Sequence, residues 1–196
     1  MDNNMLHRRE SIILTAIDVI NELGIQGLSI REVAKRQSIA TASIFGHFKS
    51  KNDLILAVLE HFTQYDLAVA QAISSWELDS RESIVRYIDS FYTYYENYPA
   101  ITAIDQALDV LRCEPEFAEK IKTILKTRWG YLGQMIKRAQ ADGQISSGID
   151  SECISDIILG SCRVICLKWR TESYSFPLKE RVLYTLKVIL DSFTPK

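Results

Sequence analysis

Glycine and proline are scarce in this sequence, and no long apolar run interrupts its charges. The chain has eight Gly and four Pro among 196 residues, which leaves few turn signals and favours helices. The longest stretch without Asp, Glu, Lys or Arg spans the 12 residues 37–48, whereas a membrane-spanning helix needs about 20 apolar residues. The sequence therefore predicts no transmembrane segment and no membrane partner.

Cysteine is also sparse, and no Cys-x-x-Cys motif occurs among Cys113, Cys153, Cys162 and Cys166. The first residues lack the basic and apolar stretches of a secretory signal, so we expect a cytoplasmic protein. Its cysteines should then be reduced thiols. Cys162 and Cys166, four residues apart, leave open a thiol sensor or a soft-metal site, although burial in the core is the simpler interpretation.

The composition is that of a globular protein of one or two domains. Apolar residues make up 47% and charged residues 24% of the chain, which is too apolar for a disordered protein. The net charge is -2, yet residues 1–51 hold seven basic against five acidic side chains. This weak asymmetry permits a polyanionic partner without requiring one.

Apolar residues recur at helical spacing along the chain, and capping residues mark the helix starts. The first apolar stripe should end at Gly24, whose left-handed conformation would let Ile25 fold back on Ile20. Capping boxes, in which a serine and an acidic residue cap each other's amides, stand at 29–32 and 50–53. Further starts stand at Asp79, Pro115, Asp150 and Pro177. Since no strand-like alternation is longer than a few residues, we predict an all-α protein with about nine helices.

Two short helices, near 30–37 and 40–47, are joined by a short turn and form a helix-turn-helix. The second begins with the small residues Thr41, Ala42 and Ser43, so its backbone and hydroxyls can approach base edges in a major groove. Because this helix is uncharged, affinity for DNA must come from neighbouring basic residues that meet phosphates. These are Arg31, Lys35, Arg36, Lys49 and Lys51.

Residues 13–62 resemble the DNA-binding domain of the TetR/AcrR transcriptional regulators along their whole length, ILTAIDVINELGIQGLSIREVAKRQSIATASIFGHFKSKNDLILAVLEHF. The resemblance rests on the glycine after the first helix, the Leu-Ser entry to the second, Val33-Ala34, His47-Phe48 and Ser50-Lys51. It implies a three-helix helix-turn-helix domain over 1–50 and a helical regulatory domain, for ligand binding and dimerisation, over 51–196. It also implies a ligand-responsive repressor that binds a double-stranded DNA operator.

The resemblance assigns roles to individual residues of the helix-turn-helix. Base-reading or groove positions fall on Arg31, Thr41 and Ser43. Phosphate-contacting positions fall on Ser29, His47 and Lys51. The candidate DNA-binding set is completed by Ala42 and Phe45.

Three residues depart from the family pattern. Phe45 stands where the family usually has Tyr, so a phosphate-bonding hydroxyl is missing. Ala40 replaces the usual capping Ser, which costs about 1 kcal/mol. Ser38 replaces the usual turn Gly, with a strain of roughly 1–2 kcal/mol if the position is left-handed.

Five aromatic side chains share one face of the helix expected over 79–98, namely Tyr87, Phe91, Tyr94, Tyr95 and Tyr98. A plain core explains them, but tyrosine hydroxyls need partners when buried, which favours a pocket for a partly apolar small molecule. The candidate ligand-binding set is completed by Phe62, Tyr65 and Trp129. No cluster of Asp, Glu or Arg in the sequence indicates a charged or metal-chelated ligand.

The helix expected over 150–170 is apolar on two sides. One stripe contains Ile154, Ile158, Ser161 and Ile165, and another contains Ile157, Val164 and Leu167. Such a helix must be covered twice. We expect a second copy of the chain to cover it together with the last helix, giving a homodimer suited to two DNA half-sites.

Two other functions remain open, an all-helical enzyme and a helical ligand-binding protein whose helix-turn-helix is only structural. The substitutions at Phe45 and Ala40 slightly favour the second of these. Against an enzyme, the sequence has no His-Glu-x-x-His, no Gly-rich phosphate loop, no Gly-x-Ser-x-Gly and no paired acid motif. We therefore expect no catalytic residues, no metal site and no cofactor.

Overall fold

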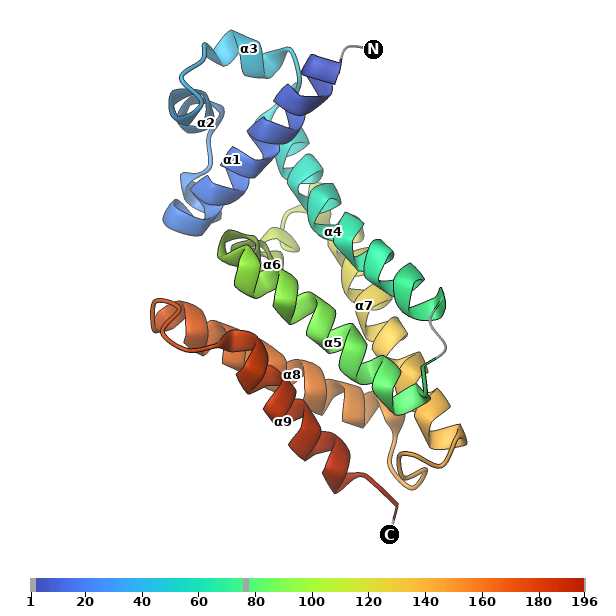
Figure 1. The fold of residues 1–196 in the computed structure, drawn as a ribbon. Coiled ribbons are helices and arrows are strands. Elements are labelled where there is room, and N and C mark those ends of the chain that lie inside the picture. The colour runs from blue at the N-terminus through green and yellow to red at the C-terminus, as the bar shows by residue number, and fades with distance from the viewer. Residues whose placement is uncertain (1–2, 76–77, 196) are drawn as a thin grey trace. The chain divides into compact units, whose positions relative to one another are not determined.

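The computed structural model describes residues 3–75 and 78–195, most of which lie in helices joined by short turns (Figure 1). In chain order the elements are α1 (Asn3–Gly27), α2 (Ile30–Arg36), α3 (Thr41–Phe45), α4 (Lys51–Ser75), α5 (Ser80–Asn97), the 3-10 helix η1 (Pro99–Ile101), α6 (Thr102–Leu111), α7 (Pro115–Ala141), α8 (Ser151–Thr171) and α9 (Leu178–Ser192). No strand occurs within these two described stretches, so the all-α prediction is confirmed. None of the helices in these stretches combines the length and the hydropathy that crossing a membrane requires.

The helices form two compact units. The first is built from the residues up to Tyr65 together with Tyr98–Thr123, and it contains the helix-turn-helix, η1 and α6. The second is built from Asp66–Asn97 and the residues from Ile124 onward, and it contains α5, α8 and α9.

In the first unit, α1 buries the apolar stripe that its sequence predicts, including Ile13, Ile17 and Ile20. Gly24 has the expected positive φ of 68°, but its ψ of 174° is extended, and helical structure continues to Gly27. The helical backbone therefore ends at Gly24 as predicted, and a short further helical segment follows it to Gly27.

In each predicted capping box, only the hydrogen bond to the serine forms. Ser29 Oγ accepts from the Glu32 amide at 3.1 Å, and Ser50 Oγ accepts from the Asp53 amide at 3.0 Å. The two carboxylates bond elsewhere, Glu32 to Arg36 Nε at 2.9 Å and Asp53 to the Lys49 amide at 2.8 Å. For Glu32 the reason is a charged partner one turn away, because a charge-assisted bond is stronger than a bond to a neutral amide.

The turn of the helix-turn-helix is held against α1 although its residues depart from the family pattern. Ser38 has a φ of 54°, so this position is left-handed and a side chain there is strained. Ala40 makes no side-chain cap for α3. The Gln37 side chain compensates by donating to the Ser11 carbonyl at 3.1 Å and to the Thr15 hydroxyl at 2.6 Å.

In the second unit, α9 packs against both α5 and α8 (Figure 1). Arg81 at the start of α5 donates to the Thr194 hydroxyl at 2.7 Å and pairs with Asp191. Lys179 at the start of α9 pairs with Asp89 of α5 at 3.2 Å. These links tie both ends of α9 to α5. Tyr184 and Val188 of α9 stay exposed.

Candidate functional site

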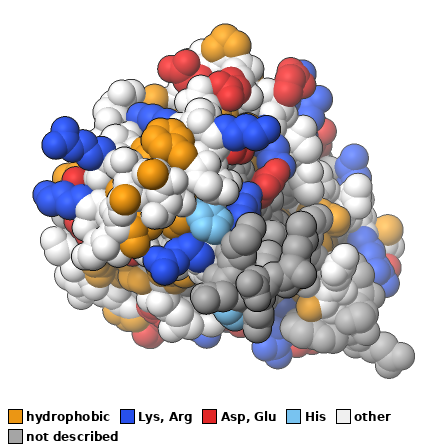
Figure 2. All heavy atoms as spheres, turned by 90° about the horizontal axis from the view of Figure 1, so that it is seen from above, with side chains coloured by type: hydrophobic (Ala, Val, Ile, Leu, Met, Phe, Trp, Pro, Cys, Tyr) orange, Lys and Arg blue, Asp and Glu red, His pale blue; other side chains and the backbone are white. Residues whose placement is uncertain are grey.

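The surface of α3 is formed by small and apolar residues. Thr41, Ala42 and Ser43 are exposed, and Phe45 is 54% exposed, whereas Ile44 is fully buried and anchors the helix. Figure 2 views the protein from above Figure 1 and shows Lys and Arg side chains interspersed with apolar and acidic ones on this face. This composition suits a surface that approaches base edges closely while neighbouring cations meet phosphates.

One of the five basic residues near α3 is held by two carboxylates. Arg31, Lys35 and Lys49 are exposed, and Lys51 is half-buried at the first residue of α4. Arg36 instead pairs with Glu22 and Glu32, both at 2.9 Å. These hydrogen bonds raise the pKa of Arg36. These two carboxylates compete with a phosphate for Arg36, whose phosphate contact stays a prediction.

The remaining predicted DNA contacts, Ser29 and His47, stand at the edges of this surface. Ser29 is exposed, and its oxygen caps α2 while its proton stays available to an acceptor. His47 is half-buried, with its ring 6.5 Å from the buried ring of Phe48. The guanidinium of Arg9 lies 5.0 Å from the centre of that Phe48 ring, so packing restricts the loop that carries His47.

The aromatic face of α5 is mostly buried in the second unit. Tyr87, Phe91 and Tyr95 pack edge to face, with ring centres 5.0 Å and 6.4 Å apart in succession. Tyr94 is only half-buried. Tyr92, which sequence reasoning missed because it lies off this face, is buried with its ring 5.5 Å from Tyr95.

A buried ion pair lies against these aromatic rings. Arg128 of α7 binds Asp66 of α4 through two hydrogen bonds of 2.5 Å and 2.8 Å, and the two side chains are only 13% and 8% exposed. The Arg128 guanidinium is 5.3 Å from the centre of the Phe91 ring and donates to the Tyr95 hydroxyl at 3.4 Å. A charged pair therefore lies against this aromatic face, although no cluster of Asp, Glu or Arg in the sequence indicated one.

One sequence signal identifies Arg128 in retrospect. It lies four residues after Ile124 and four before Leu132, two buried residues of α7, so a charge falls on an apolar stripe. Long charged side chains are almost never buried without a partner. The identity of the partner, 62 residues away, has no comparable signal.

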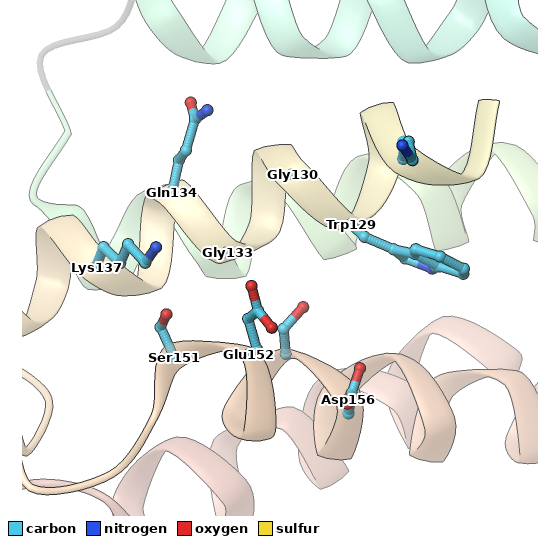
Figure 3. Close-up of a pocket in the computed structure, with 10 residues that line it drawn as sticks. Trp129, Gly130, Gly133, Gln134, Lys137, Ser151, Glu152 and Asp156 are labelled. Atoms are coloured by element: carbon cyan, nitrogen blue, oxygen red, sulfur yellow. The ribbon is translucent and has the colours of Figure 1, made fainter. Parts of the chain in front are cut away.

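The other predicted ligand residues lie on other elements. Trp129 is 52% exposed and lines a groove of about 410 Å³ between α7 and α8, beside Gly130 and Gly133 (Figure 3). Phe62, which is buried, and Tyr65, which is half-buried, belong to the first unit. Tyr98 also belongs to the first unit, where it precedes η1.

The paired cysteines lack the properties of a sensor. Cys162 and Cys166 are both buried. Burial raises the pKa of the Cys162 thiol to about 12, against the opposing effect of a hydrogen bond with Tyr92. Since the thiolate is the nucleophile and the metal ligand, burial and a raised pKa both disfavour a sensing role for Cys162. Within the described ranges, no three His, Cys, Asp or Glu side chains gather to hold a metal ion.

An exposed apolar surface runs along α8 and α9. Ile157, Val164 and Leu167 of α8 are 40–52% exposed, and Tyr184 and Val188 of α9 are 70% and 52% exposed. The other α8 stripe is buried at Ile154 and Ile158, so α8 is covered on one side only. We call these five exposed residues the α8–α9 surface.

Comparisons with known proteins match nearly the whole chain. The family described as "Bacterial regulatory proteins, tetR family" matches residues 12–58, and the family described as "YsiA-like protein, C-terminal region" matches residues 60–192. The HTH-type transcriptional regulator YvdT of Bacillus subtilis (strain 168) is 26% identical over 157 residues, which cover 76% of each chain.

Solved structures of similar fold cover the chain almost end to end. The ketosteroid transcriptional regulator KstR2 of Mycobacterium tuberculosis superposes with a TM-score of 0.83 at 18% identity, over 96% of each chain. The transcriptional regulator FadR from Bacillus subtilis, in complex with stearoyl-CoA, superposes with a TM-score of 0.80 at 20% identity, over 94% of this chain and 98% of that one. At these identities the likeness shows a common fold.

Proposed function

The chain belongs to the TetR family of bacterial regulatory proteins, and on that premise we propose that it represses transcription by binding a palindromic operator as a homodimer. The observation that supports this best is the exposed, uncharged surface of α3 with basic residues around it. An enzyme would need a polar site with a nucleophile or a general base. A protein that acts on chromosomal DNA in bacteria works in the cytoplasm.

We infer that different residues of the helix-turn-helix supply affinity and specificity. Lys51 meets a phosphate, whose negative charge is the same in every sequence, so it supplies affinity without specificity. Thr41, exposed at the first residue of α3, faces base edges and supplies specificity.

Lys51→Ala is expected to weaken binding to all duplexes alike and to reduce the slope of log affinity against log salt by about one unit. Thr41→Ala should change the preferred sequence with little change in that slope. Gel shifts on the upstream intergenic DNA and on random DNA, at several salt concentrations, measure both effects. Lys137→Ala, an exposed lysine of α7, is the control and should leave the slope unchanged. Equal losses for the Lys51 and Thr41 variants on specific and random DNA would contradict these separate roles.

We further propose that a partly apolar molecule binds beside Tyr87, Phe91 and Tyr95 and lowers operator affinity. A long-chain acyl-CoA is the first candidate, because the similar FadR structure holds stearoyl-CoA. In this proposal α4 transmits the change, because it is a continuous helix that contains both Lys51 and Asp66. A ligand shifts this equilibrium only if it binds the released dimer better than the operator-bound one.

Stearoyl-CoA is expected to lower operator affinity about 5- to 150-fold, the range of typical coupling free energies. Fluorescence anisotropy of labelled operator, titrated with stearoyl-CoA, measures this change. Coenzyme A without an acyl chain is the control and should leave the operator bound. Phe91→Ala should abolish the response and keep operator affinity in the absence of ligand. Binding of stearoyl-CoA without any change in operator affinity would refute the switch.

A further inference from the structure

Phe45 is the anomalous residue of the DNA-facing surface. It is a large apolar side chain, 54% exposed, at the last residue of α3. Exposed aromatic rings have a free-energy cost in water that contact with another apolar group removes. Because the proposed function places α3 in a major groove, the apolar partner of Phe45 is to be sought on DNA, and the role inferred for Phe45 rests on that function.

The side chains of α3 exclude most ways of reading a base. Guanine is read by Arg or Lys, adenine by Asn or Gln, and cytosine by Asp or Glu. The sequence of α3 is Thr-Ala-Ser-Ile-Phe, which contains none of these residue types. Its Thr and Ser hydroxyls can bond to more than one base, so they do not select a single one. The C5-methyl group of thymine is the apolar group that base pairs present in the major groove, and it is contacted by Ala, by the Thr methyl group and by Phe.

Three of the exposed α3 residues belong to that thymine-contacting set and share one side of the helix. Phe45 lies four residues after Thr41 and three after Ala42, and residues at these spacings are neighbours on a helix surface. All three are exposed, while Ile44 points into the core. The methyl groups of Thr41 and Ala42 and the ring of Phe45 therefore form one apolar strip.

We propose that this strip reads thymine methyl groups and that Phe45 determines specificity for thymine at one position of each operator half-site. The absence of the tyrosine hydroxyl at position 45 then affects base specificity as well as phosphate binding. A phenol at this position can bond a phosphate, whereas a phenyl ring gains most from an apolar base edge.

Deoxyuridine tests this proposal because it removes only the methyl group and keeps every hydrogen-bonding atom of thymine. The preferred site is first selected from a random duplex library with the full-length wild-type protein. Each thymine of that site is then replaced by deoxyuridine, one at a time. At the position that Phe45 reads, the wild-type protein should bind about 4-fold more weakly, the factor expected for one buried methyl-sized group.

The Phe45 variants identify which thymine the ring contacts. Phe45→Ala should bind the thymine and deoxyuridine sites equally at that position, and Phe45→Leu, which retains a large apolar side chain, should keep the discrimination. Circular dichroism verifies that both variants are folded. If deoxyuridine changes nothing for the wild-type protein, or if Phe45→Ala weakens all sequences alike, the ring contacts the backbone and the proposal is wrong. Selection of no sequence at all would refute the proposed function as well, so the two failures are distinguishable.

Discussion

Val164→Asp is expected to convert the proposed dimer into a monomer and to lower operator affinity by about 10²- to 10⁴-fold. Val164 is 52% exposed in the middle of the α8–α9 surface. A second copy of the chain would cover this surface, and the new carboxylate would then be buried among apolar side chains without a partner. Two linked helix-turn-helix units bind a palindrome with a high effective concentration, and a monomer loses that gain.

Val110→Asp is the matched control for this experiment. Val110 of α6 is 53% exposed, so the two substitutions add the same charge at the same residue type and exposure. Light scattering at micromolar concentration measures the oligomeric state, and a gel shift on the palindrome measures affinity. A wild-type protein that scatters only as a 22.4 kDa species would contradict the dimer. So would a Val164→Asp variant that behaves like Val110→Asp.

Asp66→Ala is expected to lower the free energy of unfolding by about 3–5 kcal/mol, more than most single substitutions. The reason is that Arg128 stays buried and positive after its counter-ion is removed. Replacing both partners by apolar residues, as in Asp66→Leu with Arg128→Met, should restore most of the loss, because no charge is then buried. Urea unfolding followed by circular dichroism, at one protein concentration, measures all three proteins.

An exposed ion pair serves as the reference for the buried one. Glu82 and Arg86 pair at 3.3 Å on the surface of α5, and both are well exposed. Glu82→Ala should change the free energy of unfolding by less than about 1 kcal/mol, since water already solvates both charges. If Asp66→Ala costs no more than Glu82→Ala, the pair between α4 and α7 does not hold the second unit together.

Local features of the fold were predictable because their causes lie within one or two helical turns. Ser29, Ser50 and Asp150 each cap a helix as predicted, with the Asp150 carboxylate accepting from the Glu152 amide at 2.8 Å. The left-handed turn position was identified through Ser38, where the family usually has glycine. The ψ angle of Gly24 was less predictable, because a glycine with positive φ can adopt either an extended or a left-handed ψ value.

The candidate site was predictable only in part. The α5 spacing placed Tyr87, Phe91 and Tyr95 on one face, and all three are buried. Spacing within one helix does not say which other helix supplies a neighbour. Trp129 was therefore grouped with these aromatics, although it lies in a groove between α7 and α8.

The sequence by itself determined the all-α class, the helix-turn-helix and the family, because apolar periodicity, caps and motif residues are local properties of the chain. Only the tertiary structure decided which charges are paired. Arg36 reaches Glu22 across 14 positions, and Arg128 reaches Asp66 across 62. Both pairings depend on how helices pack. Whether an arginine is paired with a carboxylate is therefore decided by residues far from it in the sequence.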